Sequence, residues 1–141
     1  MNVEDGPRAE LDRHIEAIES GYEFLLAYAA QGRDTDRGAG AGRNVREFLE
    51  AMQAALEGLG AVVRECIARR GGATAESAGA FLEALDRDAA VARSAVRLVL
   101  AQPDIGSQLV DNLNASIHLR ALLTDLFLID EVLTERRAAR T

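Results

Sequence analysis

Apolar residues recur at alternating steps of three and four along most of the chain, and this spacing is typical of one face of an α-helix. Four segments with the pattern are separated by breaks that contain glycine or proline. We expect helices over about residues 7–31, 44–70, 75–101 and 104–137. Because each helix has an apolar stripe that must be buried, the pattern predicts an all-α protein, an antiparallel up-down-up-down four-helix bundle that forms one domain over residues 1–141.

The breaks contain the residues that end helices. Residues 32–43 hold four glycines, whose freedom to adopt left-handed backbone conformations disfavours a helix, so we expect a flexible glycine-rich link there. Gly71 and Gly72 end the second segment, and Pro103 pushes the residue before it out of the helical region. The connections after the second and third segments are short, which makes the helices on either side of each connection antiparallel.

The last segment, unlike the others, is apolar on two sides. At about 100° per residue, one line of large side chains consists of Leu119, Leu122, Leu126, Ile129 and Leu133, here called the Leu119 line. A second line, about 160° away, consists of Leu113, Ile117, Ala121, Leu128 and Val132, here called the Ile117 line. Only one line can face the core of a bundle, and soluble monomers seldom expose a contiguous patch of large aliphatic side chains. We therefore predict a homodimer, or a stable protein partner, with the Leu119 line as the interface.

Polar residues of the last segment lie between its two apolar lines. His118 shares a polar stripe with Asp111 and Asp125, but each carboxylate is about 10 Å from it along the helix axis, too far to bind one metal ion with it. Arg120 lies on the opposite stripe, and an enclosed guanidinium needs a carboxylate or an anionic ligand. We expect a solvated stripe at His118, and at Arg120 either a structural ion pair or the binding of an anion.

Composition and charge narrow the functional classes. The chain has 141 residues and a net charge of −7, which opposes binding to nucleic-acid phosphates, so we expect no nucleic-acid partner. It holds no run of about 18 apolar residues and its opening residues are acidic, so we expect no membrane span, no secretory signal and a cytoplasmic location. A single cysteine, Cys66, excludes an internal disulfide and a multi-thiolate metal site.

The two ends of the chain differ in charge. The first thirty residues hold seven acidic residues and two arginines, whereas the C-terminal end carries Arg136, Arg137 and Arg140. In an up-down bundle these ends lie side by side, where opposite charges favour one orientation. Each exposed pair contributes only about 0.2–1 kcal/mol, so the charges support the topology without determining it.

Few residues in the chain are spaced in a way that indicates a catalytic or metal site. Three carboxylate pairs have a spacing of three residues, which places each pair on one helical face: Glu16 with Glu19, Glu47 with Glu50, and Glu83 with Asp86. All-α nucleotide pyrophosphohydrolases hold magnesium with similar acidic pairs, but the spacing arises often by chance in a chain rich in alanine and glutamate. A magnesium-dependent all-α hydrolase is therefore a weak alternative, and we expect no enzyme, no catalytic residue and no metal site.

The surplus apolar face favours a non-catalytic, dimeric protein-interaction module, such as an adaptor, assembly factor or regulator. The alternative is a helical bundle that binds a small molecule or cofactor in its core near Arg120, with His118 and Tyr22 as further candidate contacts. We expect no bound cofactor, because the chain lacks the Glu-x-x-His pairs of di-iron bundles. Its two histidines, His14 and His118, are also poorly placed for a haem site.

Overall fold

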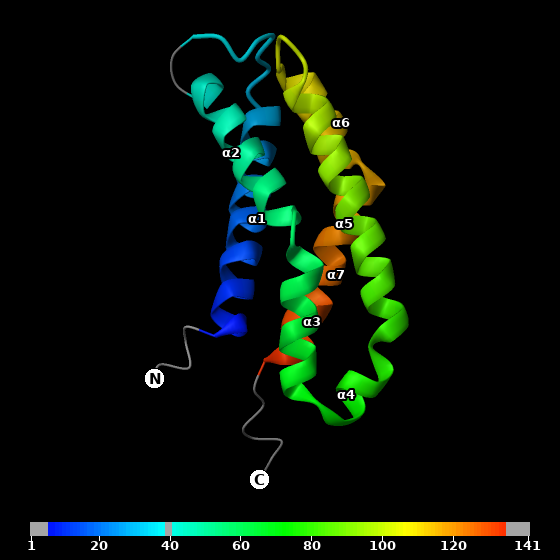
Figure 1. The fold of residues 1–141 in the computed structure, drawn as a ribbon. Helices are drawn as coiled ribbons and strands as arrows, with labels where there is room; N and C mark the ends of the chain where they lie inside the picture. Colours follow the sequence, from blue (N-terminus) through cyan, green and yellow to red (C-terminus); the bar gives the residue numbers. More distant parts are fainter. Residues whose placement is uncertain (1–5, 39–40, 135–141) are drawn as a thin grey trace.

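The computed structural model describes residues 6–38 and 41–134, which form helices and the turns between them (Figure 1). The seven helices in these ranges are α1 Pro7–Ala29, α2 Ala41–Leu56, α3 Leu59–Arg70, α4 Gly72–Ser77, α5 Gly79–Leu100, α6 Ser107–Ala115 and α7 Ile117–Leu133. No strand occurs in either range, so the all-α prediction is confirmed. None of the helices described there is long and apolar enough to cross a membrane.

Three of the four expected helices are interrupted, and the one expected over 75–101 is divided at Ala78 between α4 and α5. The segment over 44–70 bends at Gly58, whose φ of 78° is a left-handed conformation that residues with a side chain seldom adopt. The segment over 104–137 breaks at Ser116, whose extended ψ of 126° ends α6. The Ser116 hydroxyl then accepts a hydrogen bond from the His118 N–H and caps α7. The expectation of one continuous last helix is therefore wrong. The apolar spacing that predicts it continues across Ser116, although the helical backbone conformation ends there.

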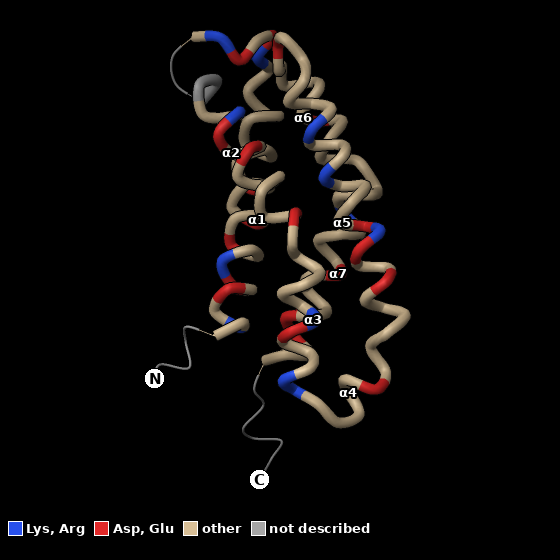
Figure 2. The backbone as a smooth tube through the Cα atoms, viewed as in Figure 1, with Lys and Arg blue, Asp and Glu red and all other residues tan. Residues whose placement is uncertain are grey.

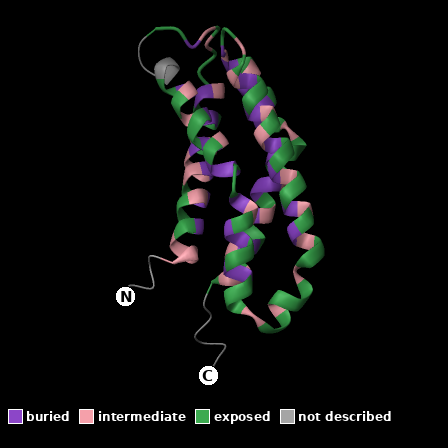
Figure 3. Ribbon diagram, in the orientation of Figure 1, coloured by how far each residue is buried: buried purple, intermediate pink, exposed green. Residues whose placement is uncertain are grey.

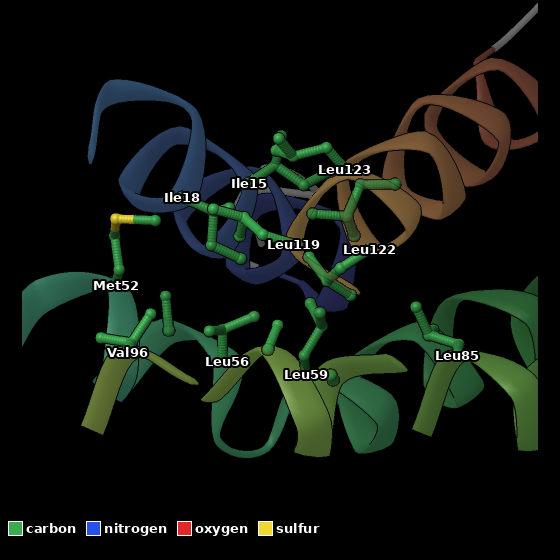
Figure 4. Close-up of a cluster of buried hydrophobic side chains, with 14 of the residues drawn as sticks. Ile15, Ile18, Met52, Leu56, Leu59, Leu85, Val96, Leu119, Leu122 and Leu123 are labelled. Atoms are coloured by element: carbon green, nitrogen blue, oxygen red, sulfur yellow. The ribbon is translucent and has the colours of Figure 1, made fainter. Parts of the chain in front are cut away.

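Apolar side chains from most of the helices form one connected core (Figure 3). Figure 4 shows side chains of α1 and α7 meeting those of α2, α3 and α5 in this core. The largest side chains with almost no exposed surface are Leu11, Ile18, Leu25, Tyr28, Leu49, Met52, Leu59, Leu85, Ile105, Leu119, Leu122 and Leu126. Burial of each aliphatic side chain in this set favours folding by about 1.5–3 kcal/mol. Because the buried side chains form one connected cluster, the bend at Gly58 and the break at Ser116 do not divide the core.

The helices pack in a ring of neighbours. α1 lies against α2, α3 and α6, and α5 lies against α2, α3 and α7. At Gly21 a Cβ atom would collide with the Met52 side chain, so glycine allows α1 and α2 to approach closely. Arg8 in the first turn of α1 pairs with Asp130 near the end of α7, so these two ends lie side by side (Figure 1).

The ion pair between the two ends runs opposite to the charge pattern of the termini. Here the cation, Arg8, is on α1 and the anion, Asp130, is on α7. The C-terminal arginines Arg136, Arg137 and Arg140 lie outside the described residues. The ends are therefore adjacent, as expected, but a different pair of charges joins them.

The link after α1 is held at its first part by a buried carboxylate. Asp36 is 9% exposed; its Oδ1 accepts a hydrogen bond of 2.7 Å from the Ile105 N–H, and its Oδ2 accepts one of 2.7 Å from Arg46 Nε. Arg46 also donates to the carbonyls of Leu100 and Gln102. Burial alone raises the pKa of Asp36, but the hydrogen bonds and the charge of Arg46 outweigh burial and hold that pKa below its usual value.

A second set of hydrogen bonds fastens the same link to the turn before α6. The Ser107 hydroxyl donates to the Tyr28 carbonyl and accepts from the Arg33 N–H, while the Ser107 N–H donates to the Arg33 carbonyl. The Tyr28 hydroxyl donates to the Ile105 carbonyl. The expectation of a flexible link over 32–43 is therefore wrong for residues 33–37; residues 39–40 lie outside the described ranges. Hydrogen bonds between this link and a turn far away in the sequence leave no periodic pattern in the sequence. The glycines are the only local signal, and glycines predict flexibility.

Candidate functional site

The Leu119 line faces the core instead of an interface, and part of the Ile117 line faces solvent instead of the core. Within the Leu119 line, Leu119, Leu122 and Leu126 have no exposed surface, and the remaining two members also pack in the core or against it. In the other line, Ile117 is 73% and Leu128 is 52% exposed. The Leu119 line therefore belongs to the core of the single chain and is not available as an interface. Its members are large throughout, whereas the other line includes an alanine, so burying the Leu119 line removes more apolar area from water.

The break at Ser116 also divides the Ile117 line. Leu113 on α6 is 5% exposed, although a continuous helix would place it on the same side as Ile117. What remains on α7 is a stripe of Ile117, Ala121, Leu128 and Val132, which we call the outer stripe; Ile117 and Leu128 are exposed, and the other two are half-buried. Phe127 is 56% exposed at the edge of the outer stripe.

A groove lies between α1 and α7 beside this edge. It has a volume of about 430 Å³ and is lined by Glu19, Tyr22, Glu23, Arg120, Leu123, Thr124 and Phe127. α1 packs closely along α6 but much less along α7. The groove lies on the surface between these two less closely packed helices.

The α1 wall of the groove is acidic. Glu19 and Glu23 line it, and acidic residues recur along α1 (Figure 2). Burial raises the pKa of Glu19, and the charges of Asp130, Glu16 and Glu23 raise it further. Burial and the neighbouring negative charges therefore both disfavour ionisation of Glu19.

The α7 wall combines one cation with apolar surface. Arg120 is exposed, and neither its guanidinium nor the carboxylates of Glu19 and Glu23 form an ion pair or a side-chain hydrogen bond with another described residue. The side chain of Leu123 is 6% exposed, and the ring of Phe127 stands largely in solvent. The groove can therefore hold a ligand that has an apolar body and a charged group.

The structure brings together two of the three residues expected to bind a ligand. Arg120 and Tyr22 line the same groove. His118 is exposed and does not line it. The groove is on the surface, whereas the expected pocket was in the core. Glu23 and Phe127 were not among the expected contacts, although steps of three and four residues place Glu19, Tyr22 and Glu23 on one face of α1.

The three carboxylate pairs considered for magnesium do not gather at one place. Glu47 and Glu50 are exposed on α2, and Asp86 of a second pair binds Arg64 on α3. Over residues 6–38 and 41–134, no group of three His, Cys, Asp or Glu side chains is placed to hold a metal ion. Cys66 is buried on α3, and burial raises the pKa of its thiol.

A pair of carboxyl groups lies between α5 and α7. Asp125 is half-buried, and its Oδ2 is buried without a hydrogen bond from an N–H or hydroxyl group in the described chain. The carboxyl group of Asp88 on α5 lies within hydrogen-bond reach of it. Burial, this hydrogen bond and the charge of Asp88 raise the pKa of Asp125 to about 7. The stripe shared with His118 is therefore only partly solvated.

Comparison with known proteins adds no assignment to this geometry. No protein-family model, curated protein or solved structure matches the chain.

Proposed function

We propose that this protein is a non-catalytic, cytoplasmic interaction module, an adaptor, assembly factor or regulator, that forms a homodimer through the outer stripe of α7. The observation that carries the proposal is the exposure of Ile117 and Leu128, 73% and 52%, on a single helix. Phe127, which is 56% exposed, extends the apolar surface at its edge. Large apolar side chains gathered in this way on a soluble protein are typical of an interaction surface.

A second copy of the chain is a suitable partner for this stripe. Its four members are spaced by four, seven and four residues, so they form a line along α7 that reads similarly in both directions. In a two-fold dimer of antiparallel α7 helices, Ile117 of one copy meets Leu128 or Val132 of the other. Burial of each large member contributes about 1.5–3 kcal/mol before the costs of association are subtracted.

We also propose that the chain is one domain with the topology of an up-down-up-down four-helix bundle. In this arrangement α2 with α3, and α6 with α7, each occupy the place of one long helix. Three features support it: the ring of neighbouring helices, the single connected core, and the ion pair between Arg8 and Asp130 at the two chain ends.

The dimer is tested by light scattering combined with size-exclusion chromatography at high micromolar protein concentration. We expect the wild type to have the mass of a dimer, and Ile117→Asp and Leu128→Asp to have the mass of a monomer while keeping their helical circular dichroism. Leu98→Asp is the matched control, because Leu98 is 67% exposed on α5 and lies away from α7. A monomeric wild type, or a dimer lost equally in all three variants, contradicts the proposal.

A second candidate function is the binding of a small molecule between α1 and α7. The specific observation in its favour is that Arg120 and Tyr22 line one groove of about 430 Å³. This volume falls within the range of roughly 300–1,000 Å³ that is usual for ligand pockets. The groove also joins apolar surface to polar groups of Glu19, Glu23 and Arg120 that no other described residue pairs, which is the composition expected of such pockets.

A further inference from the structure

The chemistry of the groove indicates which class of ligand it takes. We infer that the groove between α1 and α7 binds a small organic cation, an ammonium or guanidinium group carried on an apolar body. This inference rests on the ligand-binding function proposed for the groove and adds the ligand class. It does not depend on dimerisation through the outer stripe.

Two carboxylates without a partner supply the attraction for the cation. Glu19 and Glu23 are one helical turn apart on α1 and both line the groove. Neither forms an ion pair or a side-chain hydrogen bond with another described residue. Asp130 is close enough to act electrostatically on Glu19, but it is already paired with Arg8. Glu19 and Glu23 are therefore the acids that are free to receive a positive group.

Repulsion among the carboxylates increases the advantage of a bound cation. After burial, the charges of Asp130, Glu16 and Glu23 are what raise the pKa of Glu19. A cation beside Glu19 offsets this repulsion and favours the ionised form of Glu19. Binding should therefore weaken as the pH falls and Glu19 takes up a proton.

Aromatic and aliphatic side chains supply a surface for the body of the ligand. Tyr22 on α1 and Phe127 on α7 contribute rings to the two walls, and the buried Leu123 lines the groove with them. Faces of aromatic rings attract cations, so the rings favour the charged group as well as the apolar body. The ligand lies along Phe127 and Leu123 with its charged end toward α1.

Arg120 opposes the cation and orients it. Its guanidinium is on the α7 wall, so a positive group is repelled from that side and directed to the α1 wall. Two carboxylates face one guanidinium across the groove, so the balance of charge favours a cation over an anion. In this proposal Arg120 positions a cation, whereas the sequence predicts either a structural ion pair or an anion there.

The test titrates ¹⁵N-labelled protein, at physiological ionic strength, with three probes of similar shape. The probes are 2-phenylethylammonium, 2-phenylethanol and 3-phenylpropionate, which are cationic, neutral and anionic. We expect the cation to produce saturable shifts in the amide signals of Tyr22, Glu23, Thr124 and Phe127, and the other two to produce much smaller ones. Tighter binding of 3-phenylpropionate, or equal binding of all three, overturns the ligand class but leaves a ligand-binding groove. No saturable shift from any probe overturns both.

Variants separate specific binding from the general acidity of the protein. Replacement of Glu19→Gln together with Glu23→Gln should weaken binding of the cation by about tenfold or more, since each lost contact is charge-assisted. The matched control, Glu47→Gln with Glu50→Gln, makes the same change in net charge on α2 and should leave the affinity unchanged. Arg120→Gln should tighten binding of the cation. Equal weakening by the two double variants, or loss of binding in Arg120→Gln, contradicts the inference.

Discussion

Asp125 on α7 lies against the carboxyl group of Asp88 on α5, and its pKa is raised to about 7. The two side chains face each other between α7 and α5, and one oxygen of Asp125 is buried without a donor from an N–H or hydroxyl group in the described chain. A proton held between the two carboxyl groups removes one negative charge from the pair. The packing of α7 against α5 at Asp125 therefore depends on pH.

The pH dependence of stability follows from the direction of this shift. The pKa of Asp125 rises from 3.8 to about 7 on folding, so its contribution to stability is complete below pH 3.8 and is lost as the pH rises toward 7. We expect Asp125→Asn to raise the melting temperature at pH 8 more than at pH 5, since the amide needs no proton. The matched control is Asp111→Asn, an exposed carboxylate on α6. Equal effects of the two variants at both pH values would show that Asp125 is not protonated in the folded protein.

The sequence does not indicate that the carboxyl groups of Asp125 and Asp88 lie together. Asp125 was placed on a polar stripe with His118, which is correct for the helix itself. Asp88 is 37 positions away, on a different helix. The hydrogen bond between them depends on how α5 and α7 pack, and local periodicity carries no information about that packing.

At the scale of elements, Ser116 is the residue that determines the shape of the C-terminal part. It ends α6, caps α7 and places Leu113 and Ile117 on different faces of the molecule. The apolar spacing continues through it without a gap, so periodicity alone predicts one long helix. A serine followed by an apolar run is also a cap signal, and here that local signal is the correct one.

The cap at Ser116 contributes to stability. We expect Ser116→Ala to lower the free energy of unfolding by about 0.5–2 kcal/mol, because the first N–H groups of α7 lose their side-chain acceptor. The control is Ser94→Ala, since Ser94 is exposed within α5 and alanine is the better helix former there. Urea denaturation measures both. A Ser116→Ala variant as stable as Ser94→Ala would show that the break does not depend on the hydroxyl group.

At the scale of the whole molecule, two turns far apart in the sequence are packed against each other. A Cβ atom on Gly106 would lie 2.9 Å from the Asp34 carbonyl oxygen and 3.0 Å from that of Arg33. Both are backbone atoms, and the hydrogen bonds between Arg33 and Ser107 hold this segment in place, so the two carbonyls cannot move aside as a flexible side chain would. Gly106 is therefore required by a contact and not by its own backbone angles, since its φ is −93°.

This contact predicts opposite effects for two glycine substitutions. Gly106→Ala should destabilise the protein by more than about 1 kcal/mol, because a contact between two turns is forced apart. Gly79→Ala should be neutral or stabilise it by up to about 1 kcal/mol, because nothing lies within 4 Å of a Cβ atom there. Thermal and urea denaturation compare the two variants. Equal effects would mean that the link between α1 and α2 yields easily, as a flexible segment would.

The sequence by itself determined that the protein is all-α, roughly where its helices lie, and that its last segment has two apolar sides. These properties follow from side-chain spacing and backbone preferences, which act within a few residues. The tertiary structure alone decided which apolar side enters the core, where the long segments bend, and that Glu19, Tyr22 and Arg120 share one groove. Those outcomes depend on the area buried between helices and on the direction in which α7 leaves α6. Both are set by contacts between residues far apart in the chain.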